Sequence, residues 1–390
     1  MYKKGILWIF MALAVTFSGF SDDIKVKGTA PTFTTNDPFA QQYIEDFNRE
    51  LRNVFNEMIE ETQRTIDDTI PQGFNSNDLL KGFGTAAVFA SHGATVWAYA
   101  DYKLLSISTG VMLGLKFPGN STRTFLSGIS GGGVDINSID DLTFGINPQF
   151  FSLHAGLNPS ALIKVFPKNL FLGLRLGFFG LSNVNIPISD ITSKLKYRTF
   201  TIGLTTNYQL LPSIDLVKVI KWRGVNIGSG LIFQTTKLDF TVPFGEYRET
   251  MDFSRGSLNA HLDLVLNPTA ALNMNINTVT IPVEISTAIK LVFLNIPLGL
   301  GFDLGLGKSK MSIGMKSDVN IDTHNNIQIE QDKKGSISAS LENAHAPTAF
   351  NFKIMTGLGF TIKDRVIIDI PVTFYIKDGY NLGFTLGVRF

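Results

Sequence analysis

The sequence predicts an all-β protein: a closed antiparallel β-barrel that spans a membrane, preceded by a helical segment. Three observations predict this fold. Apolar and polar side chains alternate along many short segments, glycine is frequent opposite the apolar rows, and the chain ends on an alternating segment that finishes in Phe390. Successive strand side chains point to opposite faces, so each such strand presents one apolar face. Within lipid every backbone polar group needs a partner, which a closed sheet provides.

The composition narrows the class of protein. The 390 residues suffice for one large barrel or for two average soluble domains. Lys and Arg number 34 and Asp and Glu number 33, and this near-neutral balance gives no indication of a nucleic-acid-binding surface. The absence of cysteine excludes disulfides, thiolate catalysis and cysteine-based zinc sites. The 36 glycines and 32 phenylalanines fit a barrel with small residues inside and aromatic residues facing lipid.

Residues 1–21 have the pattern of a secretory signal peptide. Lys3 and Lys4 precede an apolar run over residues 6–17, and small residues follow, so we expect cleavage after Ser21. The apolar run is short for a membrane-spanning helix. We therefore expect strands, not a helix, to insert the mature chain into a membrane.

Residues 22–100 are predicted to form a helical, plug-like segment ahead of the barrel. A polar stretch to residue 36 leads to Asp37 as helix N-cap and Pro38 in the first turn. Apolar residues at spacings of three and four then predict one buried stripe. The stripe comprises Phe39, Tyr43, Phe47, Leu51, Val54, Phe55, Met58 and Ile59. This helix could pack on its own domain or another chain, or it could lie under the barrel mouth.

Residues 80–100 are small, apolar and interrupted by glycine. Two interpretations stay open: they enter the lumen as a plug, or they form an irregular first hairpin.

Residues 101–390 are predicted to form the barrel, with about twelve strands. Most are close to the ten residues that a tilted strand needs to cross a bilayer. The segments are 105–117, 151–157, 170–178, 200–204, 225–233, 258–266, 279–293, 298–306, 311–315, 350–362, 366–376 and 380–390. Fourteen strands result if 85–100 and 333–342 also pair.

An even number of strands places both ends of the barrel on the periplasmic side. The long polar segments are then external, namely 118–144, 241–256 and 322–346. Two apolar-basic turns are then internal, namely 158–166 and 212–220. Two short hairpins are expected on the outside, at 295–297 and 377–379.

Ionisable residues of both signs occupy the inward positions of the predicted strands. At membrane depth such groups should face water or one another. The predicted lumen-lining residues are Arg175, His261, Asp263, Glu284, Lys290, Asp303, Lys353 and Asp369. They could form a polar path or ligand clamp, or a salt-bridged network that fills the lumen. Their mixed sign argues against a strongly selective ion channel.

Enzymatic activity is not expected. Residues 128–132 match the G-x-S-x-G pattern of hydrolases, but that motif needs a preceding strand and a following helix, and here it lies in a Ser/Gly-rich loop. His261 and Asp263 fall on one face of a single strand, without a further catalytic partner. The five histidines show no metal-ligand spacing, so neither a metal nor another cofactor is expected.

The alternating segment Tyr380–Phe390 resembles the closing strand of bacterial outer-membrane β-barrels. This resemblance implies an outer-membrane location, with membrane lipid and the barrel-assembly machinery as partners. It also implies that Tyr380, Phe384 and Phe390 act as the assembly signal. An N-terminal segment ahead of a barrel of this size is similar to FadL-type transporters of hydrophobic compounds. The order of helix, small-residue segment and glycine-alternating strands is similar to spirochaetal surface barrels, including leptospiral adhesins.

These features together predict a channel or transporter for small solutes, including hydrophobic ones, with an N-terminal plug. The alternative is a structural or adhesive surface barrel that binds partners through its external loops. A membrane-embedded hydrolase is a third and weaker interpretation.

Overall fold

The computed structural model describes residues 25–35, 41–69, 76–91, 103–117, 144–188, 191–255, 258–322, 329–376 and 379–390. The predicted signal peptide, the Gly128–Gly132 loop and most of the expected external segment 118–144 lie outside these ranges. No helix in the described ranges is both long and apolar enough to cross a bilayer.

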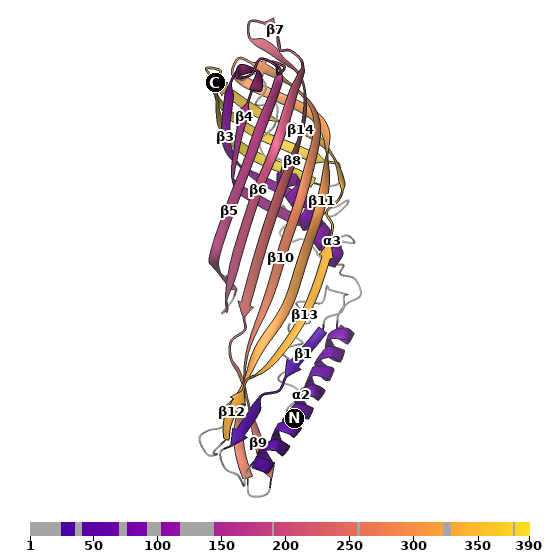
Figure 1. Ribbon diagram of the computed structural model, residues 1–390, viewed down its shortest axis with the longest axis vertical. Coiled ribbons are helices and arrows are strands. Elements are labelled where there is room, and N and C mark those ends of the chain that lie inside the picture. The colour runs from indigo at the N-terminus through magenta and orange to yellow at the C-terminus, as the bar shows by residue number, and fades with distance from the viewer. Residues whose placement is uncertain are drawn as a thin grey trace, which may run out of the picture.

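A closed antiparallel ring of ten strands forms the barrel (Figure 1). In spatial order these strands are β3 (Leu105–Lys116), β4 (Gly145–Leu157), β5 (Leu170–Ile188), β6 (Ile191–Leu211), β8 (Ile220–Pro243), β10 (Leu258–Leu291), β11 (Leu294–Asp322), β14 (Phe350–Ile362), β15 (Val366–Tyr375) and β16 (Gly379–Arg389). The ring closes where β16 pairs with β3, from Gly379 opposite Lys116 to Arg389 opposite Ser106. The predicted all-β closed barrel is confirmed.

Further strands extend the ring to a sheet of fourteen. β13 (Gly335–His345) pairs with β11, and β1 (Lys25–Thr29) pairs with β13. β9 (Tyr247–Arg255) pairs with β10, and β7 (Ile214–Val217) pairs with β8. A separate pair comprises β2 (Thr32–Thr35) and β12 (Ile329–Lys333). Residues 25–35, predicted as part of a polar stretch, thus contribute two strands.

The predicted count of about twelve differs from the ring because two pairs of predicted strands are each one long strand. Segments 258–266 and 279–293 both belong to β10, which has 34 residues. Segments 298–306 and 311–315 both belong to β11, which has 29 residues. At about 3.3 Å per residue, β10 is about 110 Å long, far more than a bilayer requires. The sheet therefore continues well beyond the ring, as the lower half of Figure 1 shows.

Both long strands reverse the polarity of their faces without changing direction. Along β10 the even-numbered side chains point inward throughout, but they change from apolar to polar between Ile276 and Thr278. The outward side chains change in the opposite sense, from Asn277 to Val279. β11 changes at the same level, where outward Leu306 is followed by Lys308. One part of each strand therefore suits lipid outside, and the other suits water outside.

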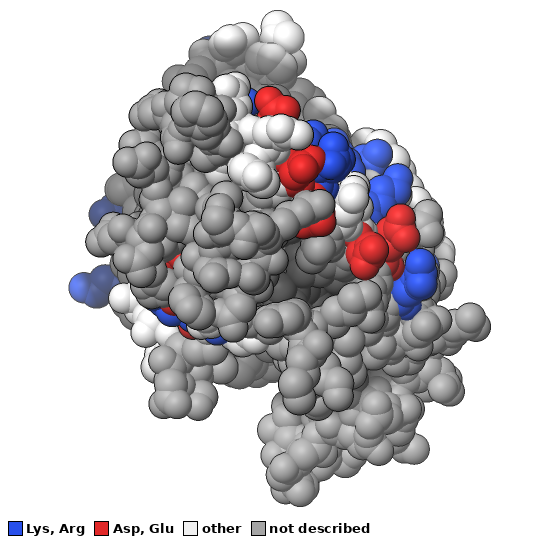
Figure 2. Space-filling model, turned by 90° about the horizontal axis from the view of Figure 1, so that it is seen from below, with Lys and Arg blue, Asp and Glu red and all other residues white. Residues whose placement is uncertain are grey.

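The part beyond this reversal, which we call the extension, has a conventional apolar core. α2 (Gln41–Thr69) packs its buried residues Ile44, Phe47, Leu51 and Phe55 against the sheet. The sheet contributes Leu264, Leu266, Val319, Ile321 and Ile337 to this core. Tyr43, predicted within the helix stripe, is 47% exposed, and its neighbour Ile44 is buried in its place. Figure 2, which views the extension from its free end, shows cationic and anionic side chains side by side on the described surface.

The longest connections of the ring lie at the end that carries the extension, although short ones occur there too, since Ile188 pairs with Ile191 and Tyr375 pairs with Gly379 at that end. The tight β10–β11 turn, the β14–β15 turn, β7 and the C-terminus lie at one end, and β9, β12 and the extension lie at the other (Figure 1). The described parts of 241–256 and 322–346 lie at the opposite end of the barrel from 158–166 and 212–220, and which end is internal stays a prediction. The hairpin predicted at 295–297 is wrong, because the turn at Val292–Phe293 joins β10 to β11 at the C-terminal end.

We predict that arginine is tolerated on the outward face of β10 only beyond the polarity reversal. Ile285→Arg places a charge in the middle of the outward apolar row and should cost about 2–4 kcal/mol of unfolding free energy in lipid vesicles. Asn273→Arg lies on the same face of the same strand and should change this free energy by less than about 0.5 kcal/mol. Urea unfolding in phospholipid vesicles measures both. Equal destabilisation by the two variants would contradict the assignment of a lipid-facing and a water-facing part.

Candidate functional site

The lumen holds a helix, α3 (Ser76–Ser91), which Figure 1 shows inside the ring. Its residues from Thr85 to Ser91 are completely buried, so this half of the helix is enclosed on all sides. Two wall glycines make room for it. A Cβ at Gly114 would lie 2.2 Å from the carbonyl oxygen of Ala86, and one at Gly145 would lie 2.1 Å from that of Gly82. For residues 76–91 the structure shows a helix inside the ring, which we call the plug, and residues 92–100 lie outside the described ranges.

Hydrogen bonds join the polar atoms of α3 to the barrel wall. The Arg175 Nη2 donates to the carbonyl oxygen of Ala90 at 3.3 Å and to Gln149 Oε1 at 2.8 Å. A cation at this position also complements the negative end of the helix dipole. Ser91 Oγ lies 2.9 Å from Thr280 Oγ1, and the backbone nitrogen of Thr348 donates to Thr85 Oγ1 at 2.9 Å. Arg175 thus holds the C-terminal end of the plug.

A buried ion cluster lies against the plug. Lys353 Nζ donates to Glu284 Oε1 at 2.5 Å and to Asp303 Oδ1 at 2.6 Å, and all three side chains are nearly inaccessible to solvent. The Tyr375 hydroxyl donates to Asp303 Oδ2 at 2.8 Å, and its ring stacks on Phe89 of α3 with centroids 3.6 Å apart. Charges buried this deeply persist only when they are paired and hydrogen-bonded. Three of the predicted lumen-lining residues, Glu284, Asp303 and Lys353, are thus joined by ion pairs.

A second polar layer consists of amides and hydroxyls on β4, β6 and β8. Gln149 Nε2 donates to Thr201 Oγ1 and Gln234 Oε1, each at 2.8 Å, and Gln234 Nε2 donates to Asn147 Oδ1 at 2.7 Å. The sequence pattern missed Asn147 and Gln149. The β3–β4 register shifts between Gly110 and Met112, so the inward residues of β4 change from odd to even numbers at this irregularity.

At the C-terminal end of the barrel a cavity of about 850 Å³ opens, which we call the mouth. Its lining carries eight cationic side chains, namely Lys103, Lys218, Lys221, Arg223, Lys290, Lys363, Arg365 and Arg389. The two carboxylate side chains in this lining are those of Asp215 and Asp364. The excess of cations gives the mouth a strongly positive character, which sequence reasoning missed because these residues come from separate turns and strand ends.

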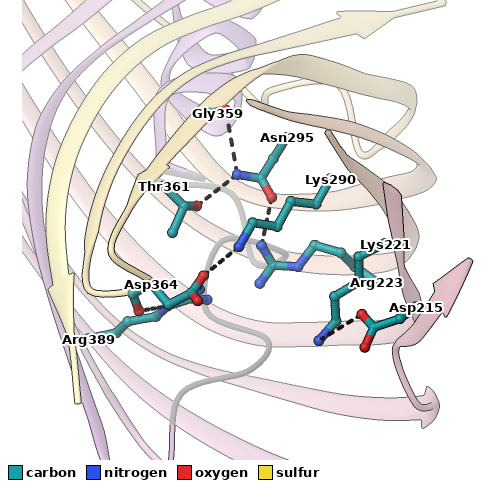
Figure 3. A network of polar contacts seen from close by, with 9 residues as sticks. All are labelled: Asp215, Lys221, Arg223, Lys290, Asn295, Gly359, Thr361, Asp364 and Arg389. Atoms are coloured by element: carbon teal, nitrogen blue, oxygen red, sulfur yellow. Dashed lines mark hydrogen bonds and ion pairs between the residues drawn. The ribbon is translucent and has the colours of Figure 1, made fainter. Parts of the chain in front are cut away.

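Asp364 contacts cationic side chains from two strands that line the mouth (Figure 3). Lys290 on β10 donates a hydrogen bond to its carboxylate, and Arg389 Nη2 on β16 lies 3.7 Å from the same oxygen. The hydrogen bond from Lys290 is the main cause that lowers the pKa of Asp364 below its ordinary value. Because this folded-state pKa is lowered, the stabilisation is present at neutral pH and is lost only as pH falls through it.

Deeper in the mouth, neutral groups hold a further cation. Arg223 Nη1 donates to Asn295 Oδ1 at 2.7 Å, and Asn295 Nδ2 donates to Thr361 Oγ1 at 2.8 Å (Figure 3). The mouth is also where strained backbone gathers. Val292, Lys363 and Asp364 all have positive φ angles, near 50°, and all three line this cavity. Such strain is concentrated at functional sites in many proteins.

The predicted lumen-lining residues fall into three places. Arg175, Glu284, Asp303, Lys353 and Asp369 are buried on the inward face of the ring. Lys290 lies at the mouth, with 17% of its side chain exposed.

Asp263 lies on the extension instead, beyond the last β8–β10 pair, Pro243 opposite Thr269. Its carboxylate accepts a hydrogen bond from Thr250 at 2.7 Å and lies 3.8 Å from Arg248. The prediction extended the barrel pattern past the polarity reversal, and so it placed this residue in the lumen. The side chain of His261 lies outside the described part of the structure.

The predicted assembly signal lies on the outward face of β16. Phe384 is 48% exposed and Phe390 is 58% exposed, and Tyr380 is half-buried. Their role in assembly stays a prediction. Among the described residues no group of three His, Asp or Glu side chains is placed to hold a metal ion.

We predict that Lys353→Met destabilises the barrel strongly, because it leaves two buried carboxylates without their ammonium partner. The expected loss is about 3–5 kcal/mol of unfolding free energy. The triple variant Glu284→Gln, Asp303→Asn, Lys353→Met removes all three charges and should recover most of that loss. Urea unfolding of the three proteins in one detergent measures the difference. A triple variant as unstable as Lys353→Met would show that the cluster is not balanced by pairing.

Solved structures with similar architecture are membrane barrels, at low similarity. The Ralstonia pickettii toluene transporter TbuX shares 8% identity over 80% of this chain and 99% of its own, with a TM-score of 0.23. The P. putida toluene transporter TodX shares 7% identity over 78% of this chain and 94% of its own, with a TM-score of 0.24. The translocator domain of the autotransporter NalP from Neisseria meningitidis shares 8% identity over 77% and 91%, with a TM-score of 0.25.

A search of curated proteins finds no match. The model of the Lsa36-like family, by contrast, matches residues 35–390, which cover α2, α3 and the complete ring. This agrees with the predicted resemblance to leptospiral surface barrels. The chain belongs to the Lsa36-like family.

Proposed function

We propose that the protein is an outer-membrane channel for small solutes, gated by the helix α3. The observation that carries this proposal is the combination of a plugged lumen with an open, charged mouth of about 850 Å³ at one end of the ring. An eight-stranded barrel is just wide enough for its own side chains to fill. A ring of ten strands that also holds a helix has little free cross-section, so passage requires α3 to move.

The lengths of the connections supply an orientation. Outer-membrane barrels have short periplasmic turns and longer external segments. The end with the β10–β11 and β14–β15 turns, the C-terminus and the mouth then faces the periplasm, and the extension with α2, which carries the longest segments, stands outside. This orientation places the mouth at the exit of the channel for an entering solute.

The mouth favours anionic solutes. The resemblance to FadL-type transporters implies hydrophobic cargo, but the lining described above is cationic and polar. Rings of Lys and Arg are the usual lining of anion and phosphate pores. A cleft lined by charge of one sign also raises the local concentration of ligands of opposite charge.

The contacts of α3 are suited to a gate. In the part of the chain that is described, hydrogen bonds and apolar contacts join α3 to the wall, and its two charged residues, Asp78 and Lys81, lie in its N-terminal half. Hydrogen bonds between neutral groups contribute about 0.5–1.5 kcal/mol each, and one from a charged group such as Arg175 contributes about 1.5–3 kcal/mol. None of the hydrogen bonds named here includes Lys353, Glu284 or Asp303. The helix can therefore leave without breaking the buried ion cluster of the wall.

We predict that a disulfide between α3 and the wall closes the channel. The hydroxyl oxygens of Ser91 and Thr280 lie 2.9 Å apart, so Ser91→Cys with Thr280→Cys places two sulfurs within bonding reach. The natural chain has no cysteine that could compete. In planar bilayers the reduced double variant should conduct, and oxidation should abolish its conductance because α3 can no longer move.

The two single-cysteine variants are the matched controls, and oxidant should leave their conductance unchanged. A deletion of residues 76–91 should conduct permanently and should carry chloride in preference to potassium. Identical conductance of the oxidised and reduced double variant would refute α3 as the gate. No conductance from any of these proteins, including the deletion, would refute the channel itself.

A second candidate function is surface binding through the extension, which the polarity reversal favours. The extension carries its own apolar core and an amphipathic helix, and neither is needed to cross a membrane. Its exposed face is of mixed charge, including the Arg49–Asp46 and Arg64–Glu60 pairs along α2. Membership of a family of surface proteins supports this candidate as well.

We predict that α2 is reachable from outside intact cells. Glu45 is exposed on α2, and Val165 is 89% exposed at the opposite end of the barrel. A membrane-impermeant maleimide should label Glu45→Cys in whole cells and should label Val165→Cys only after the outer membrane is permeabilised. The reverse pattern would overturn the orientation, and with it both the surface-binding candidate and the periplasmic mouth.

A further inference from the structure

A belt of cationic side chains runs along one side of the barrel. It lies at the level where the outward side chains of the strands change from apolar to polar. Arg198 on β6, Lys237 on β8 and Lys308 and Lys310 on β11 all point outward and are exposed. We call these four residues the basic belt. They lie within two outward positions of the last outward apolar residue of the same strand, for example Leu306 on β11, which is 55% exposed and is followed by Lys308 and Lys310.

The sheet register aligns the basic belt across neighbouring strands. Arg198 lies directly opposite Lys237, Lys237 lies opposite Asn275, and Asn275 lies opposite Lys310. Side chains directly opposite each other on one face have Cβ atoms about 4.5–5.5 Å apart, and like charges in such pairs repel. The pair of Arg198 and Lys237 is thus unfavourable unless an anion lies between them.

Among the described, paired positions of these strands, the carboxylates nearest to the belt lie in the next row, farther from the apolar face. In that row Lys196 is opposite Asp239, and Ser312 is opposite Glu342. Asp239 therefore balances Lys196 within its own row. The two rows nearest the apolar face hold the four cations of the basic belt and no carboxylate among the paired positions of β6, β8, β10 and β11.

A groove lies between the cations of the belt. It has a volume of about 600 Å³ and is lined by Lys237, Asn275 and Lys310 in the belt row and by Asp239, Asn273 and Glu342 in the next row. The two lysines bracket the amide of Asn275, which can donate to the same acceptor. Two strand spacings of about 4.8 Å separate Lys237 from Lys310, which suits a phosphate group between them.

We propose that the basic belt binds the phosphate of an anionic lipid headgroup. The proposal rests on the membrane insertion stated under Proposed function, because insertion of the apolar rows brings the belt to the headgroup level. Lys and Arg side chains at this depth are attracted to anionic lipid. This attraction is strongest close to the membrane surface, where salt screens it least. The groove continues beyond the belt along outward Asn267, Thr269, Ala271 and Asn273, small residues that leave room for the rest of a large headgroup.

The test uses the full-length protein in detergent and measures its affinity for lipid A that carries both phosphates. The double variant Lys237→Gln, Lys310→Gln should bind this lipid at least about tenfold more weakly, because charge-assisted hydrogen bonds to phosphate are lost. Lys237→Arg with Lys310→Arg should retain the affinity of the natural protein. Lys164→Gln, an exposed lysine at the opposite end of the barrel, should not change it.

Three results would overturn the proposal. They are equal affinity of the glutamine and natural proteins, equal affinity for lipid A without its phosphates, and an affinity for inorganic phosphate that matches that for the lipid. The last result would identify a site for free anions. The resistance of unheated protein to SDS shows that each variant is folded. Conductance is measured in parallel, and unchanged conductance beside weakened lipid binding separates this proposal from the channel.

Discussion

The structure depends on one constraint: backbone groups must be paired everywhere along strands whose outer surroundings change from lipid to water. Closing the ring pairs the backbone. Each strand that continues into the extension must then present apolar side chains outward over one part of its length and polar side chains outward over the rest. β10 meets this requirement by exchanging the polarity of its two faces between Ile276 and Val279 while its inward and outward positions keep the same numbering. The pairing register to β11 runs through this point without interruption, so the membrane boundary is set by side chains alone.

The same constraint determines what fills the interior. In the lipid-facing part the inward side chains are polar, and they need partners because water has little room. The structure provides them in two ways: Lys353 neutralises Glu284 and Asp303, and α3 contributes small buried residues and a ring, Phe89, that covers Tyr375. In the extension the inward side chains are apolar, and two helices cover them: α2 packs on the part farthest from the ring, and Leu80 and Ala87 of α3 pack on the part nearest to it. The helix α3 therefore spans the change, with its N-terminal half on apolar side chains and its C-terminal end on the polar wall.

The period-two pattern was sufficient to predict the class of fold and the lipid-facing rows. Contact with lipid requires apolar side chains at every outward position, and this requirement produces the alternation directly. The pattern failed where other constraints act. β10 and β11 were each divided in two, since an alternation that reverses its polarity looks like the end of one strand and the start of another. Gln149 was missed because an irregularity in the β3–β4 register changes which residues of β4 point inward. No single residue type in the sequence indicates the position of this irregularity. The mouth was missed because residues as distant as Arg223 and Arg389 meet only when the ring closes.

The contacts of the plug also indicate what opening the channel would require. If α3 leaves, Tyr375 loses the ring that covers it, and Arg175 loses one of its acceptors, the carbonyl of Ala90. Neither change separates Lys353 from its carboxylates. Arg175 would keep Gln149, and water entering the vacated space could satisfy the remaining donors, because a polar cavity of helical width admits it. The wall is thus able to remain intact around a lumen without the helix. An apolar wall could not be hydrated in this way, so it would favour the plugged state more strongly than a polar wall does. A polar lumen is therefore the property that makes a removable plug physically reasonable.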